Sequence, residues 1–261
     1  MDLRPAVAAA LLLAAPAARA GLVIGTRNTQ GTNAGQEGTV YIEGNKLASD
    51  SAGDQAHFFI WDGDANKVVL GDRAQKTYQE MTPSDVTGMK ARMSKQLEEA
   101  KARMSPEQRK ALEEMLGKQG AAAAPAAKPP ETEYVPASGG DRVLGHACKN
   151  YREVREGRTV AETCFIPWSD GVVTRADLAP LEKMEQFWRP LSEQQPGARR
   201  RQAMSEELAR APGVPAIRKT LGADGKPESE ERLTKLDRTR VPAERFQVPA
   251  GYTRSKRQLG E

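Results

Sequence analysis

Two cysteines are the residues in this chain whose chemistry is easiest to state. The sequence of 261 residues holds Cys148 and Cys164 and two histidines, His57 and His146. His146 stands two positions before Cys148, so on a β-strand both side chains would point to the same face. A cysteine beside a histidine can act as a nucleophile, whereas an even number of cysteines in an exported chain favours a disulfide bond. We predict the disulfide, with His146 as a bystander.

The segment between the cysteines bears on that pairing. Residues 155–157, Arg-Glu-Gly, are typical of a three-residue hairpin loop that ends in glycine. This loop would place Cys148 directly opposite Cys164, within reach of a disulfide. A two-residue loop at 156–157 would instead turn the cysteines to opposite faces, and no bridge could form. We therefore expect the three-residue loop.

The acidic segment 62–66, Asp-Gly-Asp-Ala-Asn, begins like a calcium-binding loop. In such a loop the sixth position is glycine and the twelfth is glutamate, but these positions hold Lys67 and Arg73. We therefore interpret the segment as a hairpin turn. The sequence also has no P-loop, dinucleotide-binding or serine-nucleophile motif. We predict no catalytic residues, no metal and no cofactor, and expect that the protein is not an enzyme.

A methionine-rich apolar stripe is the candidate binding surface. Thr82, Pro83 and Asp85 form a capped helix start, after which apolar residues recur at spacings of three and four. Because methionine adapts to ligands of varied shape, the stripe predicts either the lining of an apolar cavity or ordinary core packing. A second helix, begun by Asp177, adds an aromatic pair with the same two interpretations. The candidate lining residues are Val86, Met89, Met93, Leu97, Met104, Phe187 and Trp188.

Most of the elements that must position these residues are strands. Short β-branched and aromatic runs, separated by Gly, Asn and Asp, predict an antiparallel meander before the first helix. The expected strands there cover 22–26, 39–43, 56–61, 68–70 and 76–81.

The second half of the sequence repeats the order of strands, helix and strands. Strands resume at Val143 and run through a hairpin to Trp168, and two helical stretches follow, the second at 198–210. Closing strands are expected at 214–220, 232–240 and 245–248. This order predicts an α+β fold, in which a long curved antiparallel sheet, an incomplete β-barrel, wraps around helices on its concave face.

The first twenty residues have the pattern of a secretory signal peptide. Arg4 precedes an apolar run at 6–15, and the small-residue motif Ala18-Arg19-Ala20 follows. The run is shorter than the roughly 20 residues of a transmembrane helix. We expect cleavage after Ala20, which makes 1–20 a signal peptide.

The remaining chain is expected to form one domain. Residues 21–253 would be a single α+β unit, with an Ala/Pro-rich flexible insert at 118–131 and a C-terminal tail at 254–261. The net charge of +4 is small beside 39 basic and 35 acidic residues, so it does not favour a nucleic-acid partner. We expect a soluble periplasmic or extracellular protein, peripheral at most to a membrane. A lipid or an acylated protein is the expected partner, and the oligomeric state stays open.

Four short motifs follow one another along the chain: Lys76-Thr77-Tyr78, Cys148-Lys149-Asn150-Tyr151, Gly213-Val214-Pro215, and Phe-Gln-Val-Pro-Ala-Gly-Tyr at 246–252. Their order resembles the bacterial domain-of-unknown-function family 4412, over most of residues 21–253. Such proteins are similar in layout to periplasmic lipoprotein carriers, in which an incomplete antiparallel barrel encloses an apolar cavity. The resemblance implies this fold and a lipid- or lipoprotein-handling role, and no catalytic residues. The insert at 118–131 and Cys164 depart from the family pattern.

Three functions compete on these observations. The leading hypothesis is an exported, non-enzymatic binding or carrier module for an apolar ligand, such as a lipid or the acyl group of a lipoprotein. The alternative is a structural or interaction protein of the cell envelope with a filled core. A hydrolase that uses Cys148 comes third. A carrier needs an internal apolar void, a structural protein would fill that space, and a hydrolase needs a free thiol.

Overall fold

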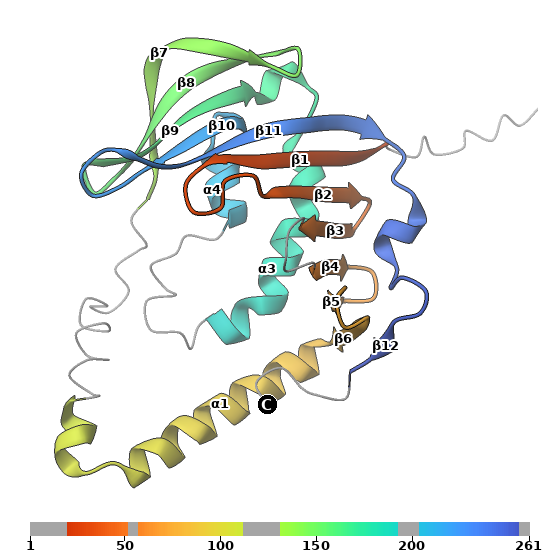
Figure 1. The fold of residues 1–261 in the computed structure, drawn as a ribbon, viewed down its shortest axis with the longest axis vertical. Coiled ribbons are helices and arrows are strands. Elements are labelled where there is room, and N and C mark those ends of the chain that lie inside the picture. The colour runs from red at the N-terminus through yellow and green to blue at the C-terminus, as the bar shows by residue number, and fades with distance from the viewer. Residues whose placement is uncertain (1–19, 52–56, 112–130, 193–203, 256–261) are drawn as a thin grey trace, which may run out of the picture.

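The computed structural model describes residues 20–51, 57–111, 131–192 and 204–255 (Figure 1). Within these ranges, twelve strands form one large, mostly antiparallel sheet that does not close on itself. Helices accompany the sheet, so the α+β class and the single antiparallel sheet are confirmed.

The N-terminal half of the sheet is a meander of six strands. They are β1 (Gly21–Gln30), β2 (Glu37–Glu43), β3 (Lys46–Ser51), β4 (His57–Asp62), β5 (Lys67–Asp72) and β6 (Thr77–Met81). All but β3 were predicted. The sequence of β3, Lys-Leu-Ala-Ser-Asp-Ser, has no β-branched or aromatic residue and so gives no local strand signal. Its pairing with β2 and β4 makes it a strand.

The C-terminal half contains five longer strands. They are β7 (Glu133–Val143), β8 (His146–Arg155), β9 (Arg158–Pro167), β10 (Gly213–Leu221) and β11 (Pro227–Thr239). The prediction that strands resume only at Val143 is wrong, because β7 already begins at Glu133. Pro136 and Gly140 are residue types that argue against a strand, so the sequence pattern did not indicate β7. The pairing with β8 shifts register between these two residues.

A short last strand, β12 (Thr253–Arg254), lies parallel to β6. The strand order is β12-β6-β5-β4-β3-β2-β1-β11-β10-β9-β8-β7. The two halves therefore meet where β11 pairs with β1. Arg254 lies opposite Tyr78, and the Ser255 N–H donates to the Tyr78 carbonyl at 2.8 Å. The predicted tail at 254–261 thus begins inside the sheet.

Three α-helices have described bounds: α1 (Pro83–Arg103), α3 (Ala179–Ser192) and α4 (Met204–Arg210). The start of α1 is as predicted, because the Thr82 N–H donates to the Asp85 carboxylate at 2.8 Å. The same arrangement opens the 3₁₀-helix η2 (Arg175–Leu178), where the Thr174 N–H donates to Asp177 at 2.7 Å. The predicted strand at 245–248 is wrong, since the 3₁₀-helix η4 (Ala243–Phe246) overlaps it.

The main core lies between the sheet and α3, on the side that we call the helix face. Trp61 of β4 is 1% exposed, and its ring meets Phe187 of α3 edge-on with centroids 5.3 Å apart. On the opposite, outer face of β4, Phe58 packs against Tyr252 from the C-terminal segment, 5.4 Å between centroids. A Cβ on Gly71 would lie 1.9 Å from the Phe58 ring. The glycine therefore makes room for this second, smaller core.

Parts of four predicted segments lie outside the described residues. They are residues 1–19 of the signal peptide, 118–130 of the insert, 198–203 of the helix expected at 198–210, and 256–261 of the tail. In the part of the chain that the structure describes, no helix combines the length and the apolar character needed to cross a membrane.

Candidate functional site

A hollow of about 700 Å³ opens on the helix face of the N-terminal half. Side chains on a strand point to alternate faces, and residues on the helix face of strands β1 to β6 contribute to its floor. Ile24, Val40, Phe59 and Leu70 form the apolar part of the lining. Polar side chains, among them Asp72, also line it. The hollow therefore offers hydrocarbon and hydrogen-bonding groups side by side.

A second hollow, of about 200 Å³, lies between the sheet and the helices. Strands β1, β2, β10 and β11 contribute residues such as Ile42 and Leu233, and the helical segments contribute residues such as Leu178 and Leu181. Most of the lining is aliphatic or aromatic. A space of this kind favours a hydrocarbon group over a polar one.

The two hollows adjoin, because Ile24, Thr26 and Val40 line both of them. All three side chains are half-buried. The volumes fall near the range of about 300–1,000 Å³ that is usual for small-molecule sites. Together they make a site with a narrow apolar end and a wider, more polar end, which is the chemistry of an amphiphilic ligand.

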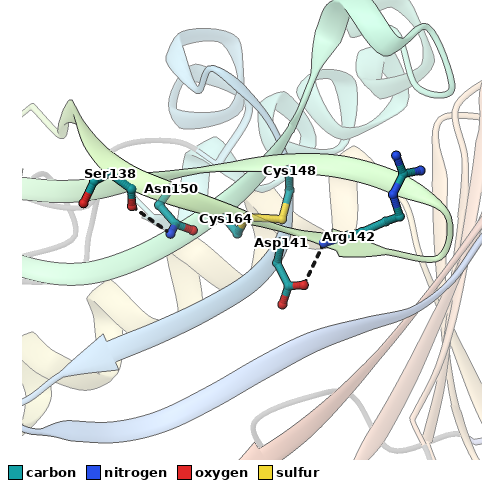
Figure 2. The surroundings of a disulfide bond; sticks show 6 residues. All are labelled: Ser138, Asp141, Arg142, Cys148, Asn150 and Cys164. Atoms are coloured by element: carbon teal, nitrogen blue, oxygen red, sulfur yellow. Dashed lines mark hydrogen bonds between the residues drawn. A yellow bond between two sulfur atoms is a disulfide. The ribbon is translucent and has the colours of Figure 1, made fainter.

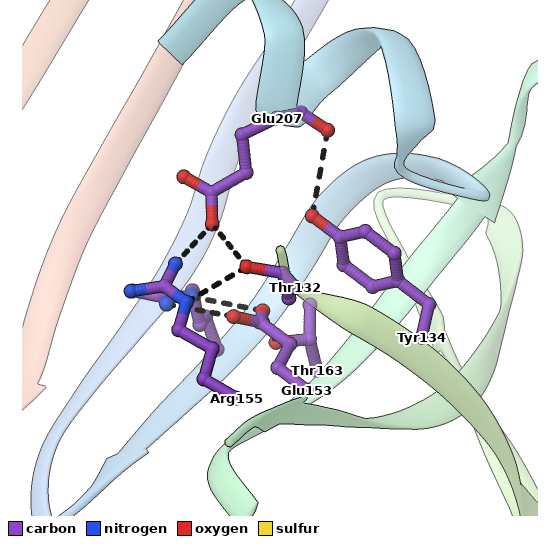
Figure 3. A network of polar contacts seen from close by, with 7 residues as sticks. Thr132, Tyr134, Glu153, Arg155, Thr163 and Glu207 are labelled. Carbon is purple, nitrogen blue, oxygen red and sulfur yellow. Dashed lines mark hydrogen bonds and ion pairs between the residues drawn. The ribbon is translucent and has the colours of Figure 1, made fainter. Parts of the chain in front are cut away.

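The C-terminal half of the sheet carries a buried polar network (Figure 3). Glu153 of β8 is 3% exposed. Its carboxylate accepts a hydrogen bond from the Thr163 hydroxyl at 2.6 Å and two from the Arg218 guanidinium, at 3.0 and 2.8 Å. A bidentate pair of this kind is among the stronger and more directional polar interactions in proteins.

A second charged pair connects this network to α4. The Arg155 guanidinium makes an ion pair with Glu207 of α4 and donates to the Thr132 hydroxyl at 2.7 Å (Figure 3). Thr132 in turn donates to the Glu207 carboxylate at 3.1 Å, and the Tyr134 hydroxyl donates to the Glu207 carbonyl at 3.4 Å. The contacts hold α4 against the beginning of β7.

The electrostatics of this network indicate a structural role. Burial raises the pKa of Glu153, but the hydrogen bonds and charge of Arg218 outweigh it, and the pKa lies below its usual value. Hydrogen bonding to Glu153 in turn raises the pKa of Arg218. Burial and the charge of Glu207 raise the pKa of the Tyr134 hydroxyl. These three groups thus keep one protonation state near neutral pH, unlike a general acid or base.

The predicted disulfide between Cys148 and Cys164 is present, with a Cα–Cα distance of 5.3 Å (Figure 2). The hairpin loop and register that were predicted to bring the cysteines together are wrong. The hairpin has the two-residue turn 156–157, in which Glu156 and Gly157 both have positive φ. By itself that turn would have placed the two cysteine side chains on opposite faces of the hairpin.

A β-bulge restores the pairing. Thr159 lies opposite Val154, but Ala161 lies opposite Glu153, so Val160 is an extra residue in β9. The shift by one residue returns both cysteines to one face. Asn150, not Cys148, then lies opposite Cys164, and the disulfide joins diagonal neighbours.

His146 does not form a dyad with Cys148, whose sulfur is bonded to Cys164. The His146 Nδ1 instead lies 3.0 Å from the Asp170 carboxylate. The third functional hypothesis, a cysteine hydrolase, therefore lacks its nucleophile.

The acidic segment 62–66 is a hairpin turn between β4 and β5, as predicted. The Asp62 carboxylate accepts the N–H groups of Asp64 and Ala65, both at 3.1 Å, and pairs with Lys46 at 3.2 Å. Burial raises the pKa of Asp62, but these contacts lower it overall. The carboxylate that would begin a calcium loop thus stabilises the turn.

The seven predicted lining residues are not brought together around one cavity. Val86 and Phe187 are buried in the core, and Met89 and Trp188 pack against it. Met104 is half-buried. Met93 and Leu97 are exposed, each at 44%. None of the seven lines the hollows of about 700 and 200 Å³, although Phe187 borders another, between α1 and α3.

The apolar residues that line the two hollows follow an alternating pattern that is visible in the sequence. The alternation of Leu22, Ile24 and Thr26, and of Val40 and Ile42, marks one face of each strand. That pattern identifies a face but does not show whether helices fill the space in front of it. The hollows therefore became visible only in the folded chain.

No family model matches this chain, and no curated protein matches it. Among solved structures, it is similar to an uncharacterized conserved protein from Thermus thermophilus, with a TM-score of 0.44 and 7% identity over 92% of this chain and 91% of that one. Two structures of PNGF-II, in the C2 and P21 space groups, are similar with TM-scores of 0.36 and 9% identity. This chain spans 31% of their length. Similarities of this size carry no argument about function.

Proposed function

We propose that this protein is an exported, non-enzymatic binding or carrier protein for an amphiphilic ligand with a hydrocarbon chain. The observation that carries the proposal is the pair of adjoining hollows that share Ile24, Thr26 and Val40. The hydrocarbon chain would enter the smaller, apolar hollow, and the polar end would stay in the larger one. In this proposal the open sheet acts as an incomplete barrel around α3.

Two further observations support export and the ligand class. The disulfide between Cys148 and Cys164 favours an oxidising compartment, which agrees with the signal-peptide pattern of residues 1–20. The order of motifs that resembles family 4412 implies lipid or lipoprotein handling. No comparison tests this resemblance, and it stays a prediction.

A structural protein of the cell envelope is the second candidate. It is favoured by the tight aromatic packing of Trp61, Phe187 and Trp188 and by the ionic network around Glu153. In this case the hollows would hold only water. The two candidates therefore differ in whether the shared wall of the hollows contacts a ligand.

The experiment is a titration of the purified protein with a dansyl-labelled fatty acid. Val40→Trp places a large ring in the wall that both hollows share, so we expect affinity to fall by at least about ten-fold. Thr234→Trp is the matched control, because Thr234 is exposed and is not part of either lining. The control should bind as the wild type does, and both variants should keep the wild-type circular-dichroism spectrum.

Two outcomes would contradict the proposal. One is a wild-type protein that does not bind the probe, and which carries no lipid in native mass spectrometry after purification from its own envelope. The other is a folded Val40→Trp variant with unchanged affinity. Either result favours the structural protein.

A further inference from the structure

The helix face of β1 to β6 is ordered in rows of side chains that run across the strands. The strand pairings place three such rows side by side. The inner row is Leu22, Ile42, Leu47, Trp61, Val68 and Met81, none of which is more than 4% exposed. These residues belong to the main core, and none of them lines the larger hollow of about 700 Å³.

The middle row continues the apolar wall of the smaller hollow into the larger one. Its residues are Ile24, Val40, Ser49, Phe59, Leu70 and Gln79, which are all half-buried and all line the larger hollow. Ile24 and Val40 also line the smaller hollow. A ligand whose hydrocarbon chain lies in the smaller hollow can therefore extend along Phe59 and Leu70.

The third row lies on the side of the middle row away from the core, and it is polar where it crosses β4, β5 and β6. His57 lies opposite Asp72, and Asp72 lies opposite Thr77. Since every second residue of a strand points to one face, these side chains share the helix face with Phe59 and Leu70. All three line the larger hollow. A headgroup beside the middle row would thus meet a carboxylate between an imidazole and a hydroxyl.

Asp72 is the carboxylate of this lining that can accept a hydrogen bond from a ligand. Its Oδ1 accepts the Gln75 N–H at 2.9 Å, and within the described residues it makes no ion pair. Asp50 also lines the larger hollow, but Arg73 and Arg245 already pair with it. Asp72 therefore contributes the negative charge that a headgroup would meet.

Positive charge is scarce in the two linings. Among the described lining residues there is one guanidinium, that of Arg218 in the smaller hollow, and no lysine. The Arg218 Nε and Nη2 already donate to Glu153, and Glu231 lines the same hollow. His57 carries positive charge only when it is protonated. An anionic headgroup would therefore meet Asp72 with no lysine or arginine of the larger hollow to offset the repulsion.

We propose that the larger hollow selects a headgroup that has no negative charge and donates hydrogen bonds, as an amine or a group of hydroxyls does, with Asp72 as the acceptor. Hydrogen bonds to an ionised carboxylate are roughly twice as strong as neutral ones. The Thr77 hydroxyl and the Gln79 amide line the same hollow and add partners for such a group. This inference rests on the proposed function, because it assigns the headgroup of the same ligand.

The test is displacement of the dansyl-labelled fatty acid by three competitors that have the same chain length and differ in the headgroup. They are decylamine, monodecanoylglycerol and decanoate, measured at about pH 8, where histidine is mostly neutral. The amine and the glycerol ester should displace the probe at concentrations at least about ten-fold lower than decanoate does, because only decanoate repels Asp72.

Asp72→Asn tests the carboxylate itself. Asparagine keeps an oxygen that can accept the Gln75 N–H and removes the charge, so we expect the affinity for decylamine to fall at least about ten-fold while that for decanoate does not fall. Asp224→Asn is the matched control, because the exposed Asp224 accepts the Lys226 N–H at 3.1 Å in a comparable turn and lines neither hollow. The control should bind all three competitors as the wild type does.

Two results would overturn the inference. One is a wild-type protein from which decanoate displaces the probe as readily as decylamine does, and this result decides the question even if Asp72→Asn lowers the melting temperature. The other is a folded Asp72→Asn variant with unchanged affinity for decylamine. In both cases the probe still binds, so the proposed function stands. A wild-type protein that binds neither the probe nor any competitor contradicts the proposed function itself, and the two failures are therefore distinguishable.

Discussion

The helix face of the sheet carries different kinds of side chain in its N-terminal and C-terminal halves. In the N-terminal half, hydrocarbon side chains such as Ile24 and Phe59 line a hollow that stays open. In the C-terminal half, Glu153 and Arg155 bind Arg218 and Glu207 and hold α4 against the sheet. Hydrophobic burial does not depend on direction, whereas a buried ion pair stabilises only when its geometry satisfies both charges. The two kinds of lining meet at the smaller hollow, whose wall includes Ile24 and Val40 from the first half and Arg218 from the network.

The outer face of the sheet is also stabilised differently in the two halves. In the N-terminal half, the C-terminal segment covers Phe58 with Tyr252, and Arg245 pairs with Asp50 at 3.1 Å. In the C-terminal half, the disulfide between Cys148 and Cys164 joins β8 to β9. On this face the N-terminal half is therefore stabilised by a packed segment and an ion pair, and the C-terminal half by a covalent bond.

The largest expected effect is in the N-terminal half. Trp61→Ala should lower the free energy of unfolding by about 3–5 kcal/mol, because it empties a fully buried site against Phe187. Trp61→Phe should cost much less. It keeps the ring contact and removes an indole N–H that has no hydrogen-bond partner in the described part of the chain. Urea unfolding of both variants measures this, and equal losses would mean that Trp61 packing does not dominate this half.

The second largest loss of stability is expected when the ionic network around Glu153 is broken. Glu153→Gln should cost about 2–3 kcal/mol near neutral pH, since Arg218 loses its charged partner. Because the pKa of Glu153 is depressed in the folded protein, its stabilisation is present above the usual value of 4.5 and is lost as pH falls through the folded value. The stability difference between wild type and variant should thus narrow below pH 4.5.

The control for this prediction is Glu156→Gln, in the exposed hairpin turn. It should change unfolding by no more than about 0.5 kcal/mol at any pH. Urea denaturation across a pH series measures both variants. A gap between wild type and Glu153→Gln that stays constant down to low pH would contradict the role given to the ionised carboxylate.

The smallest loss of stability is expected when the disulfide is removed. Replacing Cys148 and Cys164 by serine should cost about 1–3 kcal/mol, because the loop is short and its strands are already paired. Fatty-acid binding should stay unchanged, because neither cysteine lines the two hollows. Thermal unfolding and the dansyl titration test both statements. Loss of binding in the folded double variant would show that the two halves are coupled.

Local signals made a large part of this architecture predictable. The start of α1 followed from Thr82, Pro83 and Asp85, because a helix cap depends on neighbours within one turn. The turn at 62–66 followed from glycine and asparagine between two apolar runs. The disulfide itself was predictable from two cysteines in a chain with an export pattern. In each case the deciding interactions lie close together in sequence, or no alternative partner exists.

The tertiary structure alone decided the register, the less typical strands and the site. Val160 becomes a bulge because β9 must pair with β8 on one side and with β10 on the other. β3 is a strand because β2 and β4 supply its hydrogen bonds. The smaller hollow depends on where α3 and α4 lie over the sheet. The Glu153 network depends on contacts across strands far apart in sequence. Long-range packing sets these features, and a local sequence pattern does not encode how much space is left when remote segments meet.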